Sequence, residues 1–284
     1  MEVMEEIKIP FIWSGLLWKP RLNKFGFPTG YYSELNNLNI KLRGSELTIT
    51  NSLQKFYMEN NYDSFTYSQV VEAFECLNNL LPFNIYAATV KKVAMGVVIQ
   101  EDPNQILNTW LSFINKKPFP MLSRNKPYGL KYFLTDYAIK GYNKTTEVKD
   151  HNNIKLSGEF FRFEVEVKRI NNLNNGKDKI GIHTVQDLID PIKYQKLANY
   201  LIDKYHKIAK KPFINLNNTT IKEKKLIAVF KDIEVLNSIK KNHPNSYKKY
   251  RQEYKCLTNK LDDSTFQNQV INKLNQQIQF SINN

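Results

Sequence analysis

The most informative stretch of the chain is Phe160-Phe161-Arg162-Phe163-Glu164-Val165-Glu166-Val167-Lys168-Arg169. At the two-residue period of a β-strand, it separates into an apolar face, from Phe161 to Val167, and a charged face, from Arg162 to Lys168. Glutamates at i and i+2 lie about 7 Å apart along a strand, close enough for both to reach one divalent cation. Glu164 and Glu166 therefore suggest a nuclease-type metal site. The alternative is an antiparallel strand with one face in water, on which the charges only solvate the sheet.

The composition restricts the class of partner. The 284 residues are 42% hydrophobic and 13% aromatic, which allows a substantial core and argues against a disordered chain. A formal net charge of +14 favours a polyanionic partner, with nucleic acid as the first candidate. The chain is also rich in Lys, Asn and Ile, a bias that an AT-rich coding sequence would produce without any ligand. Charge alone therefore does not name the ligand.

The positive charge is concentrated late in the chain. Between Lys207 and Lys260 there are thirteen lysines and one arginine but only four acids, a net charge of +10. Within this segment Lys248, Lys249 and Arg251 are interleaved with tyrosines at helical spacing. We expect these cations to contact DNA phosphates while the tyrosines stack on bases. The alternatives are a solvated helical surface for the charges and the buried side of a helix for the tyrosines.

Cysteine usage and the start of the chain predict where the protein works. Only Cys76 and Cys256 occur, too few for a disulfide framework or a zinc site. The acidic start, Met1 to Glu6, is not followed by the apolar segment of a secretory signal. The apolar stretch from Val93 to Ile99 is far short of the roughly 20 residues that cross a bilayer. We therefore expect a cytoplasmic protein with no membrane partner.

Local patterns predict an α+β fold. Pro, Gly and aromatic residues in the first 35 positions predict an irregular but packed segment. We expect strands at 38–42, 46–50, 85–99, 132–142 and 159–169, and helices at 66–80, from 102 to about 114, at 184–188 and from 191 to about 210. The short connection between the last two strands favours antiparallel pairing. Together these elements predict a mainly antiparallel sheet flanked by helices, followed by a helical C-terminal extension.

A polar linker is predicted at 215–220 and divides the chain into two domains. Residues 1–211 form the larger predicted domain, and residues 212–284 form a basic helical C-terminal region. Neither a GxGxxG motif nor a P-loop occurs. The sequence therefore gives no support to dinucleotide chemistry or to nucleotide hydrolysis of the P-loop type.

Several motifs occur together in an order known from one protein family. The run from Tyr142 to Glu147, Tyr-Asn-Lys-Thr-Thr-Glu, resembles the Tyr-Asp/Asn-Lys-x-x-Glu segment of rolling-circle replication initiators. The strand from Arg162 to Val167 resembles their Arg-x-Glu-x-Glu/Arg motif. Ser52 to Tyr57 and Gly181 to Leu188 are similar to flanking segments of the phage-type proteins. Over residues 38–210 the chain thus resembles the replication initiators of filamentous phages and related plasmids, which makes 1–211 an initiator-like catalytic domain.

The resemblance implies that a tyrosine cleaves one DNA strand at an origin, leaving a 5′-phosphotyrosyl link and a free 3′ end. Tyrosine is a poor nucleophile at its ordinary pKa of about 10, so a metal or a base must favour the phenolate. Glu164 and Glu166 would hold Mg²⁺ or Mn²⁺, and Arg162 or Lys144 would stabilise the developing oxyanion. Arg162 and Lys168 join the cations expected to contact DNA. The implied partners are origin DNA, single-stranded or supercoiled, and a host helicase.

One position departs from the family pattern. Related initiators carry an acid on an earlier strand, and the matching stretch here, Val90-Lys91-Lys92-Val93-Ala94-Met95-Gly96, has Ala94 in its place. Alanine offers no ligand to a cation. Three outcomes stay open: weak metal binding by two carboxylates, recruitment of another acid such as Asp136, or an inactive site. The simpler interpretation of Ala94 is a small residue inside a buried strand.

Sixteen tyrosines compete for the role of nucleophile. The resemblance points to the helix after the glutamate strand, which carries Tyr194, Tyr200 and Tyr205. At about 100° per residue, Tyr194 and Tyr205 share an apolar stripe with Leu197 and Leu201, while Tyr200 lies on its flank. The stripe predicts packing, but the spacing from the glutamates favours Tyr205, with Tyr200 as the runner-up. The four histidines do not form the His-hydrophobic-His pair of another class of nicking proteins.

Three functional hypotheses follow. The first is a metal-dependent enzyme that nicks and rejoins DNA to initiate rolling-circle replication. The second, motivated by Ala94, is a catalytically impaired DNA-binding protein derived from such an initiator. The third is a structural or RNA-binding protein whose basic charge follows from genome composition.

Overall fold

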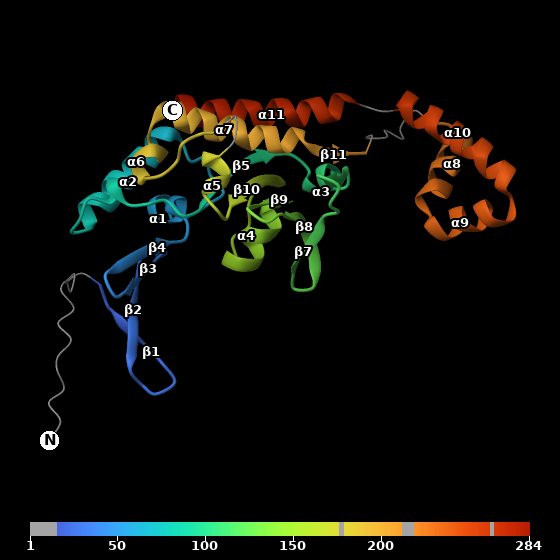
Figure 1. Ribbon diagram of the computed structural model, residues 1–284. Helices are drawn as coiled ribbons and strands as arrows, with labels where there is room; N and C mark the ends of the chain where they lie inside the picture. Colours follow the sequence, from blue (N-terminus) through green and yellow to red (C-terminus); the bar gives the residue numbers. More distant parts are fainter. Residues whose placement is uncertain (1–15, 176–178, 212–218, 262–263) are drawn as a thin grey trace, which may run out of the picture. The chain divides into compact units, whose positions relative to one another are not determined.

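The computed structural model describes residues 16–175, 179–211, 219–261 and 264–284. These residues form two compact units, whose elements are labelled in Figure 1. The first unit contains the described parts of Met1–Val93, Lys168–Ala198 and Gln279–Asn284. The second contains those of Ala94–Val167 and Asn199–Ile278. The domain boundary predicted at residue 212 falls in 212–218, outside the described residues, and stays a prediction.

The first unit begins with a four-stranded antiparallel meander. Its strands, in sheet order, are β1 (Lys19–Leu22), β2 (Pro28–Leu35), β3 (Leu38–Arg43) and β4 (Glu46–Thr50). Asn36 and Asn37 form the tight β2–β3 turn, and both take the positive φ angles that asparagine tolerates better than most residues. The strands predicted at 38–42 and 46–50 are therefore confirmed.

The helices of the first unit are short except for α2 and α7. They are α1 (Leu53–Met58), α2 (Tyr67–Leu80), the 3₁₀ turn η1 (Ile85–Ala87), α5 (Asn171–Asn174), α6 (Val185–Leu188) and the first half of α7 (Pro191–His206). Thr66 begins α2 in a capping box with Gln69. Val90 N donates to His183 O at 2.8 Å, and Val185 N donates to Ala88 O at 3.0 Å. These bonds join two segments that are distant in sequence.

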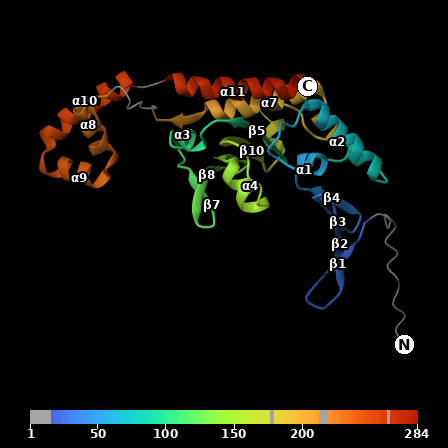
Figure 2. The ribbon, with the colours of Figure 1, turned by 180° about the vertical axis from the view of Figure 1, so that it is seen from behind.

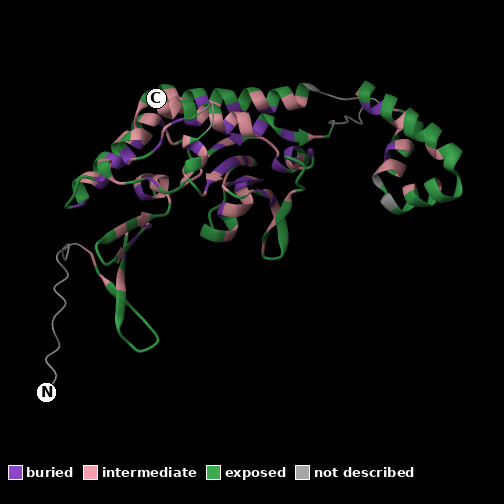
Figure 3. Ribbon diagram, viewed as in Figure 1, coloured by how far each residue is buried: buried purple, intermediate pink, exposed green. Residues whose placement is uncertain are grey.

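The second unit is built on a five-stranded sheet. Its order is β5 (Val93–Gln100), β10 (Phe160–Val167), β9 (Tyr137–Asn143), β8 (Lys126–Phe133) and β7 (Phe119–Ser123). The two central strands, β9 and β10, are the most continuously buried, as the purple segments of Figure 3 show. They pair antiparallel, with Glu164 opposite Lys140 and Phe163 opposite Gly141. The predicted antiparallel pairing of these segments is confirmed.

Trp110 fills the core on the apolar side of this sheet. Its ring lies 5.8 Å from that of Tyr132 and 6.1 Å from those of Phe161 and Phe163. Gly141 makes room for it, because a Cβ at that position would lie 2.3 Å from the indole ring. The other elements around the sheet are α3 (Pro103–Leu107), α4 (Lys144–Asn152), the second half of α7, the β6 (Trp110–Phe113) and β11 (Ile208–Lys210) pair, and α11 (Ser264–Asn283) up to residue 278.

Three helices of the basic C-terminal region pack together, as Figure 2 shows in the reverse view. They are α8 (Ile221–Lys231), α9 (Ile233–Asn242) and α10 (Pro244–Leu261). Thr220 caps α8 and Asp232 caps α9 through their side chains. Phe230 and Tyr254 stack with ring centroids 4.3 Å apart. The linker predicted at 215–220 lies, up to residue 218, outside the described residues.

Four predicted elements differ from the structure. The segment 85–99 begins with η1, and its strand starts only at Val93. The helix predicted from 102 to about 114 ends at Leu107, because Trp110–Phe113 pairs as a strand with β11. The single strand predicted at 132–142 is the β8–β9 hairpin. The irregular start contains β1 and β2, whose connecting turn holds Gly26 at a φ of 85°.

The α+β class, with mainly antiparallel sheets and C-terminal helices, is confirmed. Thr66 at the start of α2, the short helix at 185–188 and Pro191 at the start of α7 also match the sequence patterns. Within the described residues, no helix is both long enough and apolar enough to span a bilayer.

Candidate functional site

The polar face of the five-stranded sheet gathers several of the predicted site residues. Residues paired across antiparallel strands share a face, so Glu164 and Lys140 project together, as do Arg162 and Tyr142. Lys131 on β8 pairs with Lys140 and joins the same face. The face therefore holds cations and a phenol that the sequence analysis did not assign to it.

Both carboxylate oxygens of Glu164 are engaged by protein groups. Lys140 Nζ donates to Oε1 at 2.7 Å, and the Tyr142 hydroxyl donates to Oε2 at 3.2 Å. Arg162 Nε lies 3.4 Å from the same Oε2. Because Glu164 is only 9% exposed, these groups rather than bulk water solvate its charge.

Glu166 shares one of these cations. Lys140 Nζ lies 3.1 Å from Glu166 Oε2, and Lys131 Nζ lies 3.6 Å from the same oxygen. The ammonium of Lys140 thus bridges the two glutamates. It occupies the place between the carboxylates where the sequence predicts a divalent cation.

Gly96 on β5 allows the guanidinium of Arg162 to lie close to the backbone. A Cβ at position 96 would lie only 3.2 Å from both Nε and Nη2 of Arg162. Ala94 is two residues away on the same strand and is exposed, so it shares this face with Gly96. The interpretation of Ala94 as a small buried residue is therefore wrong, because β5 turns this position outward.

The opposite charges on this face stabilise the ionised forms of one another. Burial of Glu164 opposes its ionisation, but Arg162 and Lys140 outweigh burial and lower its pKa from the ordinary value. Burial likewise opposes the ionisation of Glu166, and Lys140 lowers that pKa. Burial works against the charge of Lys140, yet Glu164 and Glu166 raise its pKa. All three side chains therefore carry their charges at neutral pH.

A divalent cation does not fit these residues as they are arranged. Among the residues that the structure describes, no group of three or more His, Cys, Asp or Glu side chains is placed to hold a metal ion. The two glutamates already accept from Lys140, and three cations against two carboxylates leave the face positive. Asp136 lies in the β8–β9 turn and acts on Tyr137 and Tyr200 instead. Mg²⁺ or Mn²⁺ stays a prediction without a matching set of ligands.

Tyr205 lies on the opposite face of the sheet from the glutamates. Its ring packs 5.1 Å from Phe163, the neighbour of Glu164, and 6.3 Å from Trp110. Adjacent residues of a strand project to opposite faces. Tyr205 is 2% exposed, and burial raises the pKa of its hydroxyl. The structure therefore does not bring the preferred nucleophile to the predicted metal site.

Tyr200 also belongs to the apolar side. Lys204 Nζ lies 4.3 Å from the ring centroid of Tyr200 and 5.1 Å from that of Tyr137. Tyr137 pairs with Val167, so it shares the face of Val167 rather than that of Glu166. Burial raises the pKa of Tyr200. The tyrosine that does contact a glutamate is Tyr142.

Lys144 is completely buried at the start of α4. Its ammonium pairs with Glu147, one turn along the same helix. Asn143 caps this helix by accepting from Thr146 N at 2.8 Å. In the same corner Thr145 Oγ1 accepts from Phe160 N at 3.0 Å. The Tyr142 to Glu147 motif thus has a structural role, since it ties the start of α4 to the start of β10.

The predicted DNA-contacting cations are dispersed. Arg162 is engaged with Glu164, and Lys168 follows β10 as a partly exposed residue of the first unit. Lys248, Lys249 and Arg251 are exposed on α10. Among the interleaved tyrosines, Tyr254 stacks on Phe230, while Tyr250 is 42% exposed. The α10 tyrosines are therefore divided between packing and an exposed surface.

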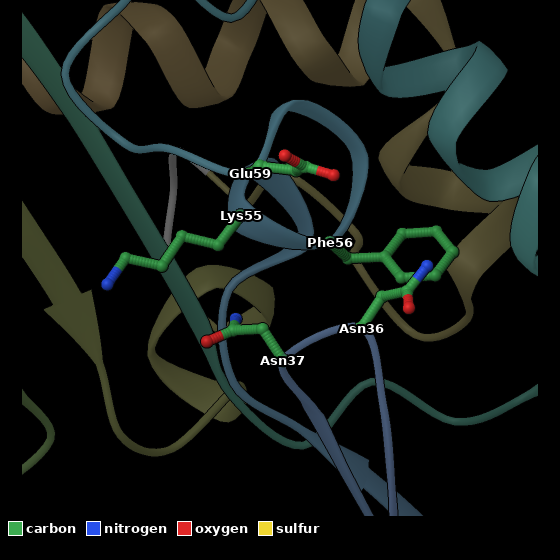
Figure 4. Close-up of a pocket in the computed structure, with 5 residues that line it drawn as sticks. All are labelled: Asn36, Asn37, Lys55, Phe56 and Glu59. Atoms are coloured by element: carbon green, nitrogen blue, oxygen red, sulfur yellow. The ribbon is translucent and has the colours of Figure 1, made fainter.

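The first unit has a shallow pocket that includes none of the predicted site residues. Figure 4 shows its lining, which consists of Asn36, Asn37, Lys55, Phe56 and Glu59. Asn36 and Asn37 come from the β2–β3 turn, and the other three come from α1 and its C-terminal cap. None of these five residues belongs to the polar face of the five-stranded sheet.

Sequence reasoning missed Lys140, Lys131 and the contact of Tyr142 with Glu164. The spacing of Lys140 and Tyr142 places them on one strand face. A single strand over 132–142 predicts the same shared face but not the β8–β9 hairpin, which brings Lys131 next to Lys140. The opposition of Lys140 to Glu164 depends on strand register, which the chain supplies only once folded.

Comparisons with known proteins give distant structural similarities only. No protein-family model matches the sequence, and no curated protein matches it. Among solved structures, the rolling-circle replication initiator protein from Geobacillus stearothermophilus is similar with a TM-score of 0.39 and 12% identity. The match covers 79% of this chain and 83% of that chain. A similarity this distant does not define the activity of the present protein.

Proposed function

We propose that this protein binds DNA as a protein of the rolling-circle replication-initiator type, without metal-dependent cleavage at Glu164 and Glu166. The observation that carries the proposal is Lys140, whose ammonium lies 2.7 Å from Glu164 and 3.1 Å from Glu166. A site prepared for a divalent cation needs free carboxylate oxygens. Here the protein supplies the neutralising charge itself.

Three further features support DNA binding without cleavage. The ordered motifs from Ser52 to Leu188 resemble the initiator family, while Ala94 replaces the acid of its pattern. The predicted nucleophiles, Tyr205 and Tyr200, pack on the other side of the sheet. The segment from Lys207 to Lys260 carries a net charge of +10, which suits a phosphate backbone.

Binding is tested with labelled single-stranded and duplex DNA across a range of salt concentrations. We expect the logarithm of the affinity to fall linearly with the logarithm of the salt concentration. Replacing Lys248 and Lys249 on α10 with alanine should weaken binding and flatten the slope. A matched variant, with Lys91 and Lys92 replaced by alanine, loses the same charge elsewhere and should bind more tightly than the α10 variant. No salt-dependent DNA binding by the folded protein would contradict the proposal.

Cleavage is tested by incubating the protein with Mn²⁺ and a panel of single-stranded and supercoiled origins. A covalent protein–DNA adduct that resists denaturation marks a phosphotyrosyl link. We expect DNA binding but no adduct. An adduct that requires Mn²⁺ and disappears in Glu164→Ala would overturn the proposal of a non-cleaving protein and support the hypothesis of a metal-dependent enzyme.

A nicking and joining enzyme is the second candidate, and one contact favours it. The Tyr142 hydroxyl donates to Glu164 at 3.2 Å, beside the cations Arg162 and Lys140. A phenol that is hydrogen-bonded to a carboxylate has the arrangement of a nucleophile next to its general base. Its reaction would join the phenol oxygen to phosphorus, pass the phenol proton to Glu164, and release the 3′ oxygen with a proton from Lys140.

Burial works against this second candidate. Tyr142 is 6% exposed, and burial raises its pKa well above the ordinary value. The decisive comparison is between Tyr142→Phe and Tyr205→Phe in the adduct assay. An adduct that survives in Tyr205→Phe and is lost in Tyr142→Phe would establish Tyr142 as the nucleophile. Loss only in Tyr205→Phe or Tyr200→Phe would instead support the helix that the family resemblance indicates.

A further inference from the structure

We propose that Lys140 takes the place of a divalent metal ion on the polar face of the sheet, so that Glu164 and Glu166 bind no such cation. The inference concerns metal binding and is independent of DNA. Its consequence, that DNA phosphates would meet protein cations alone at this face, rests on the proposed function.

The position of Lys140 carries the inference. Its Nζ contacts one oxygen of each glutamate, at 2.7 Å for Glu164 and 3.1 Å for Glu166. An ammonium and a divalent cation compete for the same carboxylate lone pairs, and two like charges exclude each other at contact distance. The backbone places Lys140 directly opposite Glu164 in the β9–β10 ladder, within reach of both carboxylates.

The remaining oxygens are also engaged. Glu164 Oε2 accepts from the Tyr142 hydroxyl and lies 3.4 Å from Arg162 Nε. A metal binding at Glu164 would have to displace a phenol and a guanidinium as well as Lys140. Glu166 retains more freedom, since its side chain is 34% exposed, but a single exposed carboxylate is a weak ligand.

The neighbouring strand is built for the cation of Arg162. Gly96 leaves the space that its guanidinium occupies, and any larger residue would press on Nε and Nη2. Ala94, on the same face of β5, contributes no acid. Strand β5 thus leaves room for the Arg162 guanidinium at Gly96 and offers no metal-binding side chain at Ala94.

The test measures Mn²⁺ binding by titration of the full chain, using the signal of free Mn²⁺ and calorimetry. We expect no binding by the unaltered protein at sub-millimolar Mn²⁺. Lys140→Met should raise the Mn²⁺ affinity by about tenfold or more, because it removes a like charge from the position between the two carboxylates. Lys131→Met is the matched control: it removes the same charge from a residue whose ammonium lies 3.6 Å from Glu166 Oε2, farther than that of Lys140 from either glutamate, so its Mn²⁺ affinity should rise much less.

Folding is checked by circular dichroism before each titration. If Lys140→Met does not fold, Lys140→Gln removes the charge while keeping a hydrogen-bond donor for Glu164. This variant should also bind Mn²⁺ more tightly than the unaltered protein. Mn²⁺ binding by the unaltered protein that Glu164→Gln abolishes would overturn the inference. So would a folded Lys140 variant with no gain. A failure of DNA binding, measured separately in the presence of a chelator, would instead count against the proposed function alone.

Discussion

The two faces of β10 lie one residue apart in sequence and are held by different forces. On the face of Phe163, rings from Trp110 and Tyr205 close around a side chain that is fully buried. On the face of Glu164, a carboxylate is surrounded by Lys140, Tyr142 and Arg162. The apolar face is stabilised by area removed from water, and the polar face by mutual neutralisation of charges.

Each face also depends on a glycine. Gly141 leaves space for the indole of Trp110, and Gly96 leaves space for the guanidinium of Arg162. In both cases a Cβ added to the glycine would lie in close contact with that side chain. Position on a strand, rather than residue type alone, decides whether a tyrosine packs in the core, as Tyr132 does, or joins the charged cluster, as Tyr142 does.

The largest expected effect is on the apolar face. Phe163→Ala removes a fully buried ring between Trp110 and Tyr205, and it should lower the free energy of unfolding by about 3–5 kcal/mol. Urea unfolding, followed by tryptophan fluorescence and circular dichroism, measures the change. A loss below 1 kcal/mol would mean that this face does not form the main core of the unit.

Glu164→Ala should have a smaller effect on the polar face. It leaves Lys140 and Arg162 without their shared carboxylate, and hydrogen bonds to charged groups contribute about 1.5–3 kcal/mol. The same unfolding experiment measures it, with Glu166→Ala as the control. Glu166 is more exposed and should matter less. An equal loss in both variants would contradict the central place of Glu164.

Acid should weaken the polar face and leave the apolar face unaffected. The folded pKa values of Glu164 and Glu166 are lowered, so their contribution is complete above the ordinary glutamate pKa of about 4.3 and is lost as the pH falls through the folded values. We expect the free energy of unfolding to decline below that pH, and Glu164→Gln to flatten the decline. Phe163→Ala should shift the whole curve without changing its slope.

The smallest effects come from two tyrosine hydroxyls. Tyr142→Phe removes the bond to Glu164 and should lower the free energy of unfolding by about 1 kcal/mol. Tyr132 lies in the apolar core, and its buried hydroxyl has no hydrogen-bond partner in the described part of the chain. Tyr132→Phe should therefore be neutral or stabilising. Matched thermal melts compare the pair, and equal losses would contradict the distinction between the faces.

Some elements followed from local chemistry. Thr66 and Gln69 define the start of α2 through a capping box, and Pro191 marks the start of α7. Other elements depended on distant partners. Trp110–Phe113 continues an apolar helical pattern in the sequence, yet it forms a strand because β11 supplies its hydrogen bonds. The residues near Trp110–Phe113 in the sequence carry no pattern that predicts its pairing with β11.

The two faces of β10 can be read from its residues alone, because the alternation of Phe, Arg, Phe, Glu and Val is a property of one strand. The basic character of the C-terminal region can be read in the same way. The partners of each face are set by folding: Tyr205 packs on the side of Phe163, and Lys140 lies between Glu164 and Glu166. Strand register explains this difference, since hydrogen bonds between β9 and β10 place Lys140 opposite Glu164, and neither strand encodes that pairing alone.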